Sequence, residues 1–196
     1  MKDPLRIGFA LTGSFCTFGK VMPVIGALAA RGCEITPILS FNAAALDTRF
    51  GDAAMWREKL VELTGREPID TITAAEPIGP KKLFDVLVVA PCTGNTLAKL
   101  AHGITDTPVT MAVKSHLRGE KPVVIAVSTN DGLSGSAANL GTLLGRRHFY
   151  FVPLRQDAPL AKPRSLVADM EHLPETIDAA LEGRQLQPIL LAPGKG

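Results

Sequence analysis

The chain has 196 residues, of which 46% are hydrophobic and 20% are charged, and its formal net charge at pH 7 is +2. This length suits one domain with a full hydrophobic core. A small net charge, with one Trp and one Tyr, argues against a nucleic-acid-binding protein. The apolar runs are shorter than the ~20 residues that a membrane-spanning helix needs. The start of the chain, MKDPLRIGFAL, has no signal-peptide pattern. We therefore expect a soluble, cytoplasmic protein.

Cysteine and histidine are too scattered along the chain to indicate a metal site. The cysteines are Cys16, Cys33 and Cys92, and the histidines are His102, His116, His148 and His172. Their spacing matches neither a CxxC motif nor the usual Cys/His zinc patterns. We predict reduced thiols and no bound metal.

Short apolar runs alternate with helical patterns along most of the chain. The expected strands cover residues 5–11, 34–39, 85–90, 122–127 and 148–152. The expected helices cover residues 18–31, 53–63, 95–102, 107–117, 134–144 and 166–181. This alternation predicts a single-domain α/β fold, with a doubly wound (Rossmann-like) parallel sheet and helices on both faces. The strands are continuously apolar, which indicates burial on both faces.

Three details refine this expected fold. Residues 71–82 are rich in proline and glycine and are expected to form a connecting loop. Pro37 indicates that the second strand is irregular or lies at a sheet edge. We expect the α/β domain to cover residues 1–184 and a loosely ordered C-terminal tail to cover residues 185–196.

The first strand is followed by a loop, TGSFCT, that begins a helix. Ligands of open α/β sheets bind at the carboxyl ends of the strands, and helix N-termini attract phosphate. Gly13 and Ser14 are therefore candidate phosphate-binding residues. The alternative is a plain helix cap with a tight turn. The loop has neither GxGxxG nor the Lys of a P-loop, which disfavours an ordinary NAD or nucleoside triphosphate site.

Loops after the later strands offer further polar groups at the same edge. Ser40 ends the second strand and either terminates it or reaches the same phosphate. Thr93 and Asn95 either cap the next helix or line the crevice. Asn130, in the sequence STND, has the same two interpretations. For Cys92 we favour an inert buried side chain over a nucleophile, since no His lies near it in sequence.

One long block, APCTGNTLAKLAHGITDTPVT, carries a specific family resemblance. Together with TGSFCTF after the first strand, it resembles the flavoprotein fold of the homo-oligomeric flavin-containing cysteine decarboxylases. That family has a proline-Ala-Ser-Ala-Asn-Thr segment, followed by Ile-Ala-Lys-hydrophobic-Ala-x-Gly-Ile-x-Asp. Here residues 91–96 read PCTGNT and residues 97–106 read LAKLAHGITD. The resemblance covers most of residues 5–155.

The resemblance implies that FMN binds in the crevice. The residues implied to hold its phosphate are Gly13, Ser14 and Ser40. The residues implied to line the flavin ring or ribityl chain are Pro91, Cys92, Thr93 and Asn95. Asn130 matches the last residue of the family's proline-x-Met-Asn segment.

The chain also departs from the decarboxylase pattern. Residues 50–63, where the family has an active-site His, contain none, and no Cys follows Cys92. Val127 and Thr129 stand where the family has the Pro and Met of its later segment. Cysteine decarboxylation is therefore not expected.

Within this superfamily, GFALTGSFCTF, the APCTGNT block and AVSTNDGLSGSAANLG resemble the family of dipicolinate synthase B subunits. This implies an oxidoreductase component that acts with the A subunit of dipicolinate synthase to convert dihydrodipicolinate to dipicolinate, in the mother cell of a sporulating bacterium.

The resemblance also implies a homo-oligomer, a trimer or a multiple of trimers, with the small-residue helix 134–144 as a candidate contact. Candidate cations for the substrate carboxylates are Lys114, Arg118 and Arg155. An FMN-dependent decarboxylase-type flavoprotein and a non-catalytic FMN-binding subunit remain alternatives.

Overall fold

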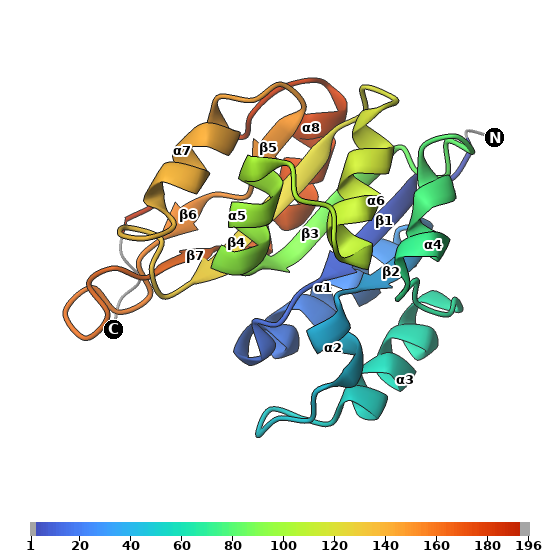
Figure 1. Cartoon of the computed structure of the whole chain (residues 1–196), viewed down its shortest axis with the longest axis horizontal. Helices are drawn as coiled ribbons and strands as arrows, with labels where there is room; N and C mark the ends of the chain where they lie inside the picture. Colours follow the sequence, from blue (N-terminus) through green and yellow to red (C-terminus); the bar gives the residue numbers. More distant parts are fainter. Residues whose placement is uncertain (1–2, 193–196) are drawn as a thin grey trace.

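The computed structural model describes residues 3–192, which form a sheet between two layers of helices (Figure 1). The strands are β1 (Arg6–Leu11), β2 (Glu34–Leu39), β3 (Val86–Cys92), β4 (Val123–Thr129), β5 (Phe149–Phe151), β6 (Leu154–Arg155) and β7 (Leu166–Ala168). Their order is β2-β1-β3-β4-β7-β6, with β5 also paired to β4. Strands β1 to β5 pair in parallel, whereas β7 pairs antiparallel with both β4 and β6.

Helices cover both faces of this sheet, as predicted. The α-helices are α1 (Phe18–Ala30), α2 (Phe41–Ala45), α3 (Ala53–Thr64), α4 (Ile72–Ala75), α5 (Gly94–His102), α6 (Pro108–Leu117), α7 (Ala137–Leu144) and α8 (Leu173–Leu181). The 3-10 helices are η1 (Phe15–Thr17), η2 (Glu76–Ile78) and η3 (Met170–His172). Helices α1 and α8 pack together on one face, and α5 and α6 lie on the other (Figure 1). Among residues 3–192, no helix is both long and apolar enough to cross a membrane.

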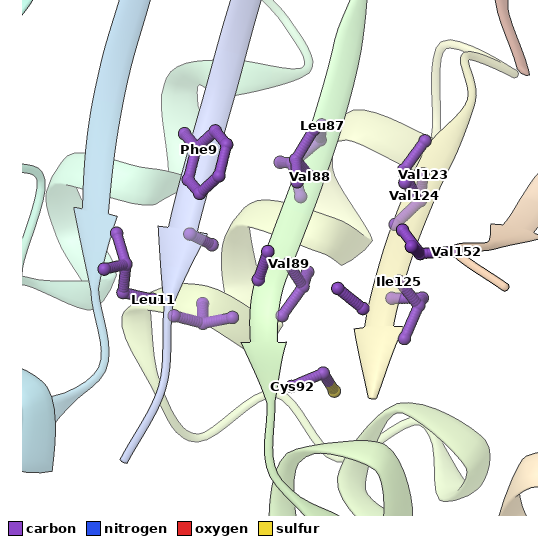
Figure 2. Packing of buried hydrophobic residues seen from close by; sticks show 14 of the residues in the cluster. Phe9, Leu11, Leu87, Val88, Val89, Cys92, Val123, Val124, Ile125 and Val152 are labelled. Atoms are coloured by element: carbon purple, nitrogen blue, oxygen red, sulfur yellow. The ribbon is translucent and has the colours of Figure 1, made fainter. Parts of the chain in front are cut away.

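The centre of the sheet is apolar on both faces. Figure 2 shows side chains of β1, β3 and β4 in one cluster, in which Phe9, Val88 and Ile125 are fully buried. This confirms the burial that the continuous apolar strands predicted. Strand β2 lies at the sheet edge, which agrees with the interpretation of Pro37.

The structure corrects several expected boundaries. The helix predicted for 166–181 is wrong in its first part, because residues 166–168 form β7 and α8 begins only at Leu173. The sheet is mostly parallel, as predicted, and β7 adds the two antiparallel pairings. The expected loop 71–82 contains α4 and η2, and Thr71 caps α4 by accepting a hydrogen bond from the Ala74 amide. The helix expected from residue 134 begins at Ala137.

Strand β3 continues two residues beyond its predicted end. Pro91 lies inside the strand, at a shift of register between Val89 and Cys92 relative to β4. Proline is tolerated within a sheet at such irregularities, because the ladder hydrogen bond is already interrupted there. The predicted stop at Ala90 was therefore wrong.

Gln185 and residues 189–191 form hydrogen bonds with β5 and β6, although a loose tail was expected from residue 185. The Gln185 side chain donates to the Phe151 carbonyl and accepts from its amide, both at 2.7 Å. Leu190 forms an isolated parallel bridge with Leu154. Residues 193–196 of the expected tail lie outside the described residues.

The buried side chain of His116 in α6 gives stability a dependence on pH. Its Nε2 lies 3.1 Å from the Pro122 carbonyl oxygen, and burial lowers its pKa from 6.5 to about 4. The folded state therefore keeps this imidazole neutral at pH values where the unfolded chain takes up a proton. The resulting stability is fully present above pH 6.5 and is lost as the pH falls toward 4.

We expect this one group to reduce the free energy of unfolding by about 2 kcal/mol between pH 7 and pH 5. Urea denaturation at the two pH values measures the change. His116→Gln, which does not titrate, should show a correspondingly smaller loss between the same pH values. Equal losses in the two proteins would contradict the assignment to His116.

Candidate functional site

A cleft lies at the carboxyl ends of the central strands and consists of two adjoining hollows. The larger has a volume of about 450 Å³ and the smaller about 330 Å³. Gly13 and Thr93 line both hollows and therefore form the wall between them. Volumes of ~300–1,000 Å³ are typical of small-molecule sites. The cleft is where the sequence predicted a ligand.

Three hydroxyl groups meet in the larger hollow. The Ser128 hydroxyl oxygen lies 2.8 Å from that of Ser14 and 2.9 Å from that of Thr17. These bonds connect the loop after β1 to the end of β4, 114 residues apart. Thr17 and Ser128 were not among the predicted site residues. Hydroxyl groups can donate or accept, so this cluster can rearrange toward a polar ligand.

A fourth hydroxyl group, that of Thr12, joins the loops after β1 and β3. It donates to the Pro91 carbonyl oxygen at 2.7 Å and accepts from the Thr93 amide at 3.0 Å. Thr12 is almost completely buried. Its side chain thus satisfies backbone groups on the wall of the cleft.

Helix starts contribute backbone N–H groups to the cleft. Thr93 caps α5 by accepting from the Thr96 amide, and Ser40 caps α2 by accepting from the Ala43 amide, each at 3.2 Å. Both therefore serve as caps, and both also line the smaller hollow. By contrast, no side chain caps η1 or α1. The first N–H groups of this segment are suited to an anion.

Two glycines in the cleft differ in the space around them. A Cβ at Gly13 would lie 3.6 Å from Asn42 Cβ and from the Phe15 ring, which is ordinary contact. Packing therefore does not require glycine at position 13, and its missing side chain leaves room between the hollows. A Cβ at Gly94 would lie 2.6 Å from the Ser136 hydroxyl oxygen. Gly94 is required for close packing of α5 against the end of β4.

Six of the eight predicted cofactor-binding residues line the two hollows. They are Gly13, Ser14, Ser40, Thr93, Asn95 and Asn130. The other two, Pro91 and Cys92, are buried and do not line either hollow. Figure 2 shows Cys92 at the end of β3 among the core side chains, and burial raises the pKa of its thiol. This agrees with an inert side chain rather than a nucleophile.

Acidic groups around the cleft are held by local donors. Lys99 pairs with Asp106 at 2.8 Å and lowers the pKa of that carboxyl group. Asp131 accepts from the hydroxyl groups of Thr129 and Ser136, which lower its pKa. These carboxylates stay ionised and fix neighbouring polar side chains. No local sequence pattern indicated the contacts of Asp131.

The three cations predicted to bind substrate carboxylates do not lie together. Arg155 lines a hollow of about 610 Å³ that shares Lys20 and Asp157 with the larger hollow, and it pairs with Asp169. Lys114 and Arg118 line a separate pocket that has no residue in common with the cleft. Only Arg155 is therefore near enough to the cleft to meet a ligand that extends from it.

Comparison with known proteins agrees with this geometry. The family model described as Flavoprotein matches residues 1–140. The chain belongs to the flavoprotein family. The dipicolinate synthase B subunit of Bacillus subtilis (strain 168) is 49% identical over 186 residues, which are 95% of this chain and 93% of that protein. This confirms the resemblance that the sequence motifs indicated.

Solved flavoprotein structures have the same fold. The crystal structure of the dipicolinate synthase B subunit from Bacillus halodurans is 44% identical, with a TM-score of 0.89, and the match covers 96% of this chain and 97% of that chain. The FMN-dependent cysteine decarboxylase SpaF is 25% identical, with a TM-score of 0.67 over 90% of this chain and 97% of that chain. The α/β fold predicted from the sequence is therefore confirmed.

Proposed function

We propose that this chain is the B subunit of a dipicolinate synthase. Together with the A subunit of that enzyme, it converts dihydrodipicolinate to dipicolinate (pyridine-2,6-dicarboxylate). The observation that carries the proposal is the 49% identity to the Bacillus subtilis protein over nearly the full length of both chains. Flavoproteins share a fold across different reactions, so this similarity to one enzyme subunit is stronger support than the fold.

The proposed cofactor is FMN, bound across the two hollows. The smaller hollow offers hydroxyl and amide donors from Ser40 and Asn95, which suit a phosphate and ribityl chain, while the Lys99 ammonium there is paired with Asp106. The larger hollow, next to Thr93 and Asn130, is the roomier and suits the ring. The gap at Gly13 supports a ligand that passes from one hollow to the other.

The remaining predicted residues have supporting roles in this proposal. Ser14 keeps the hydroxyl cluster of the larger hollow together, and Pro91 accepts the Thr12 hydrogen bond that fixes the wall. Cys92 anchors the end of β3 in the core. None of these three roles requires a side chain that reacts with the substrate.

Converting a dihydropyridine to a pyridine removes a hydride equivalent and a proton. When bound, FMN supplies a ring that can accept the hydride. The chain itself binds and orients the reactants. Arg155 and Lys20, in the hollow that continues from the cleft, are the proposed partners of the substrate carboxylates. Asp169 holds the Arg155 guanidinium in place.

Reconstitution from the two purified subunits tests this function. With dihydrodipicolinate generated in the assay and FMN present, we expect dipicolinate to form faster with both proteins together than with the A subunit on its own. Arg155→Gln should raise the KM for the substrate, since it removes a guanidinium donor. If the A subunit reaches the full rate without this chain, the proposed joint enzyme is wrong.

The same samples separate the alternatives. A flavin absorbance band without any effect on the rate would favour a non-catalytic FMN-binding subunit. Carbon dioxide release from a cysteine-containing substrate would favour a decarboxylase. The missing His in residues 50–63 and the missing late Cys argue against that activity.

Assembly and location complete the proposal. We propose a homo-oligomer, a trimer or a multiple of trimers, in the cytoplasm of the mother cell. In support, Phe41, Leu46, Phe50 and Met55 are large apolar side chains that are 41–47% exposed on adjacent segments of the chain. Helix α7 remains a candidate contact. Light scattering measures the mass, and a monomer would contradict this assembly.

A further inference from the structure

A pocket of about 380 Å³ lies away from the cleft, between α5 and α6. Most of its lining surface is apolar. The apolar residues that line it are Leu100, Ile104, Val113, Leu117 and Phe149. None of its lining residues lines either hollow of the cleft. The pocket is therefore a separate feature that the proposed function does not use.

All charged residues that line this pocket are cations. They are Lys114 from α6, Arg118 from the residue that caps the end of α6, and Arg146 from the segment after α7. Within residues 3–192, none of the three forms a salt bridge. Arg146 donates to the carbonyl oxygens of Leu100 and Ala101 at 3.1 and 2.6 Å, which fixes it at the end of α5. A pocket with such a lining attracts anions.

The combination of an apolar lining and cations that have no carboxylate partner in the described part of the chain limits the kind of ligand that the pocket can bind. A small inorganic anion would leave the apolar walls unused, and a neutral hydrocarbon would leave the cations unpaired. A flat ring with carboxylate groups at its edge satisfies both, because such a ring can contact Val113 and Phe149 with its faces while its oxygens accept hydrogen bonds from Lys114 and Arg118.

We propose that this pocket is a second binding site, for aromatic carboxylates. The choice of probe rests on the proposed function, because pyridine-2,6-dicarboxylate would be its product and has this chemistry. A site that binds product away from the cleft lets the protein sense product without blocking FMN. The reconstitution assay measures the synthase activity separately, so either proposal can fail alone.

Titration calorimetry of the full chain with pyridine-2,6-dicarboxylate tests the site. The double variant Lys114→Gln, Arg118→Gln should bind at least about tenfold more weakly, since two charge-assisted contacts are lost. Ile104→Glu should have a similar effect, because it adds a carboxylate at a position that is 46% exposed and tolerates a polar side chain. Uncharged pyridine-2,6-dimethanol should not bind.

A matched control removes the same charge elsewhere. Lys81 and Arg164 are exposed and lie outside the pocket lining, so Lys81→Gln with Arg164→Gln should leave the affinity unchanged. All variants should bind FMN like the parent protein, which also shows that they fold.

Two results would overturn the proposal. In the first, binding of the dicarboxylate survives the pocket variants and is lost in Arg155→Gln, which would mean that it binds only beside the cleft. In the second, the dicarboxylate does not bind, and the pocket variants instead release the partner protein of the synthase or change the oligomer mass. That outcome would make the pocket a protein interface.

Discussion

Replacing Gly13 with alanine is expected to weaken FMN binding by about 10- to 100-fold, a loss of roughly 1.4 to 3 kcal/mol. Gly13 is in the wall shared by the two hollows, and the new methyl group would fill space that the ligand needs. The fold should tolerate it, because its nearest neighbours would be at 3.6 Å. Fluorescence titration with FMN measures the affinity, and thermal denaturation without FMN measures the stability.

Gly19→Ala is the matched control for this experiment. Gly19 lies in the first turn of α1, close to Gly13 in sequence, and a Cβ there would meet nothing within 4 Å. It should leave FMN affinity unchanged. If Gly13→Ala binds FMN as tightly as this control does, the proposed path of the cofactor across the wall is wrong.

Gly79→Ala is expected to reduce the free energy of unfolding by about 3 to 5 kcal/mol, among the larger effects of a single substitution. A Cβ at Gly79 would lie 2.0 Å from the Ser115 carbonyl oxygen, so η2 and α6 must separate. The separation would also break the bond from the Gly79 amide to the Ser115 hydroxyl, now 2.8 Å. That hydroxyl in turn donates to the Glu76 carbonyl oxygen at 2.6 Å.

Gly141→Ala tests whether close contact, rather than loss of glycine itself, causes this effect. Gly141 lies within α7 and a Cβ there would meet nothing within 4 Å. Alanine should stabilise the helix by about 0.5–1 kcal/mol. Urea denaturation compares both variants with the parent. A loss below about 1 kcal/mol for Gly79→Ala would contradict the packing described between η2 and α6.

Features that depend on a local run of residues were predictable from the sequence. Strands β1, β3 and β4 are continuous apolar runs, and each is followed by polar residues. Once the sheet is parallel, these loops must meet at one edge. For this reason the sequence offers Gly13, Thr93 and Asn130 as candidates for one cleft, and all three line it.

Features that depend on distant partners were not predictable in the same way. Leu166–Ala168 is a run of three residues, too short to distinguish a strand from the start of a helix. It forms a strand because its backbone pairs with Ser128 and Thr129 at the end of β4. The hydroxyl cluster of Ser14 and Ser128 likewise requires two loops that only the folded sheet brings together.

The direction in which a side chain faces was also not predictable from the sequence. Cys92 and Thr93 are adjacent in sequence, but the first faces the core and the second faces the cleft. Lys114 in α6 and Arg118 at its C-cap are four residues apart and share one face, which a helical pattern shows. The pattern does not show which way that face points, and it points away from the cleft.

The hydrogen bonds of the Thr12 hydroxyl have a consequence for how tightly a ligand binds. Because this buried group connects the loops after β1 and β3 through protein atoms alone, the spacing of the two walls is set before any ligand arrives. A preorganised wall avoids part of the entropic cost of ordering on binding. Thr12 lines the smaller hollow, and it can therefore increase affinity beyond any contact that it makes with the ligand.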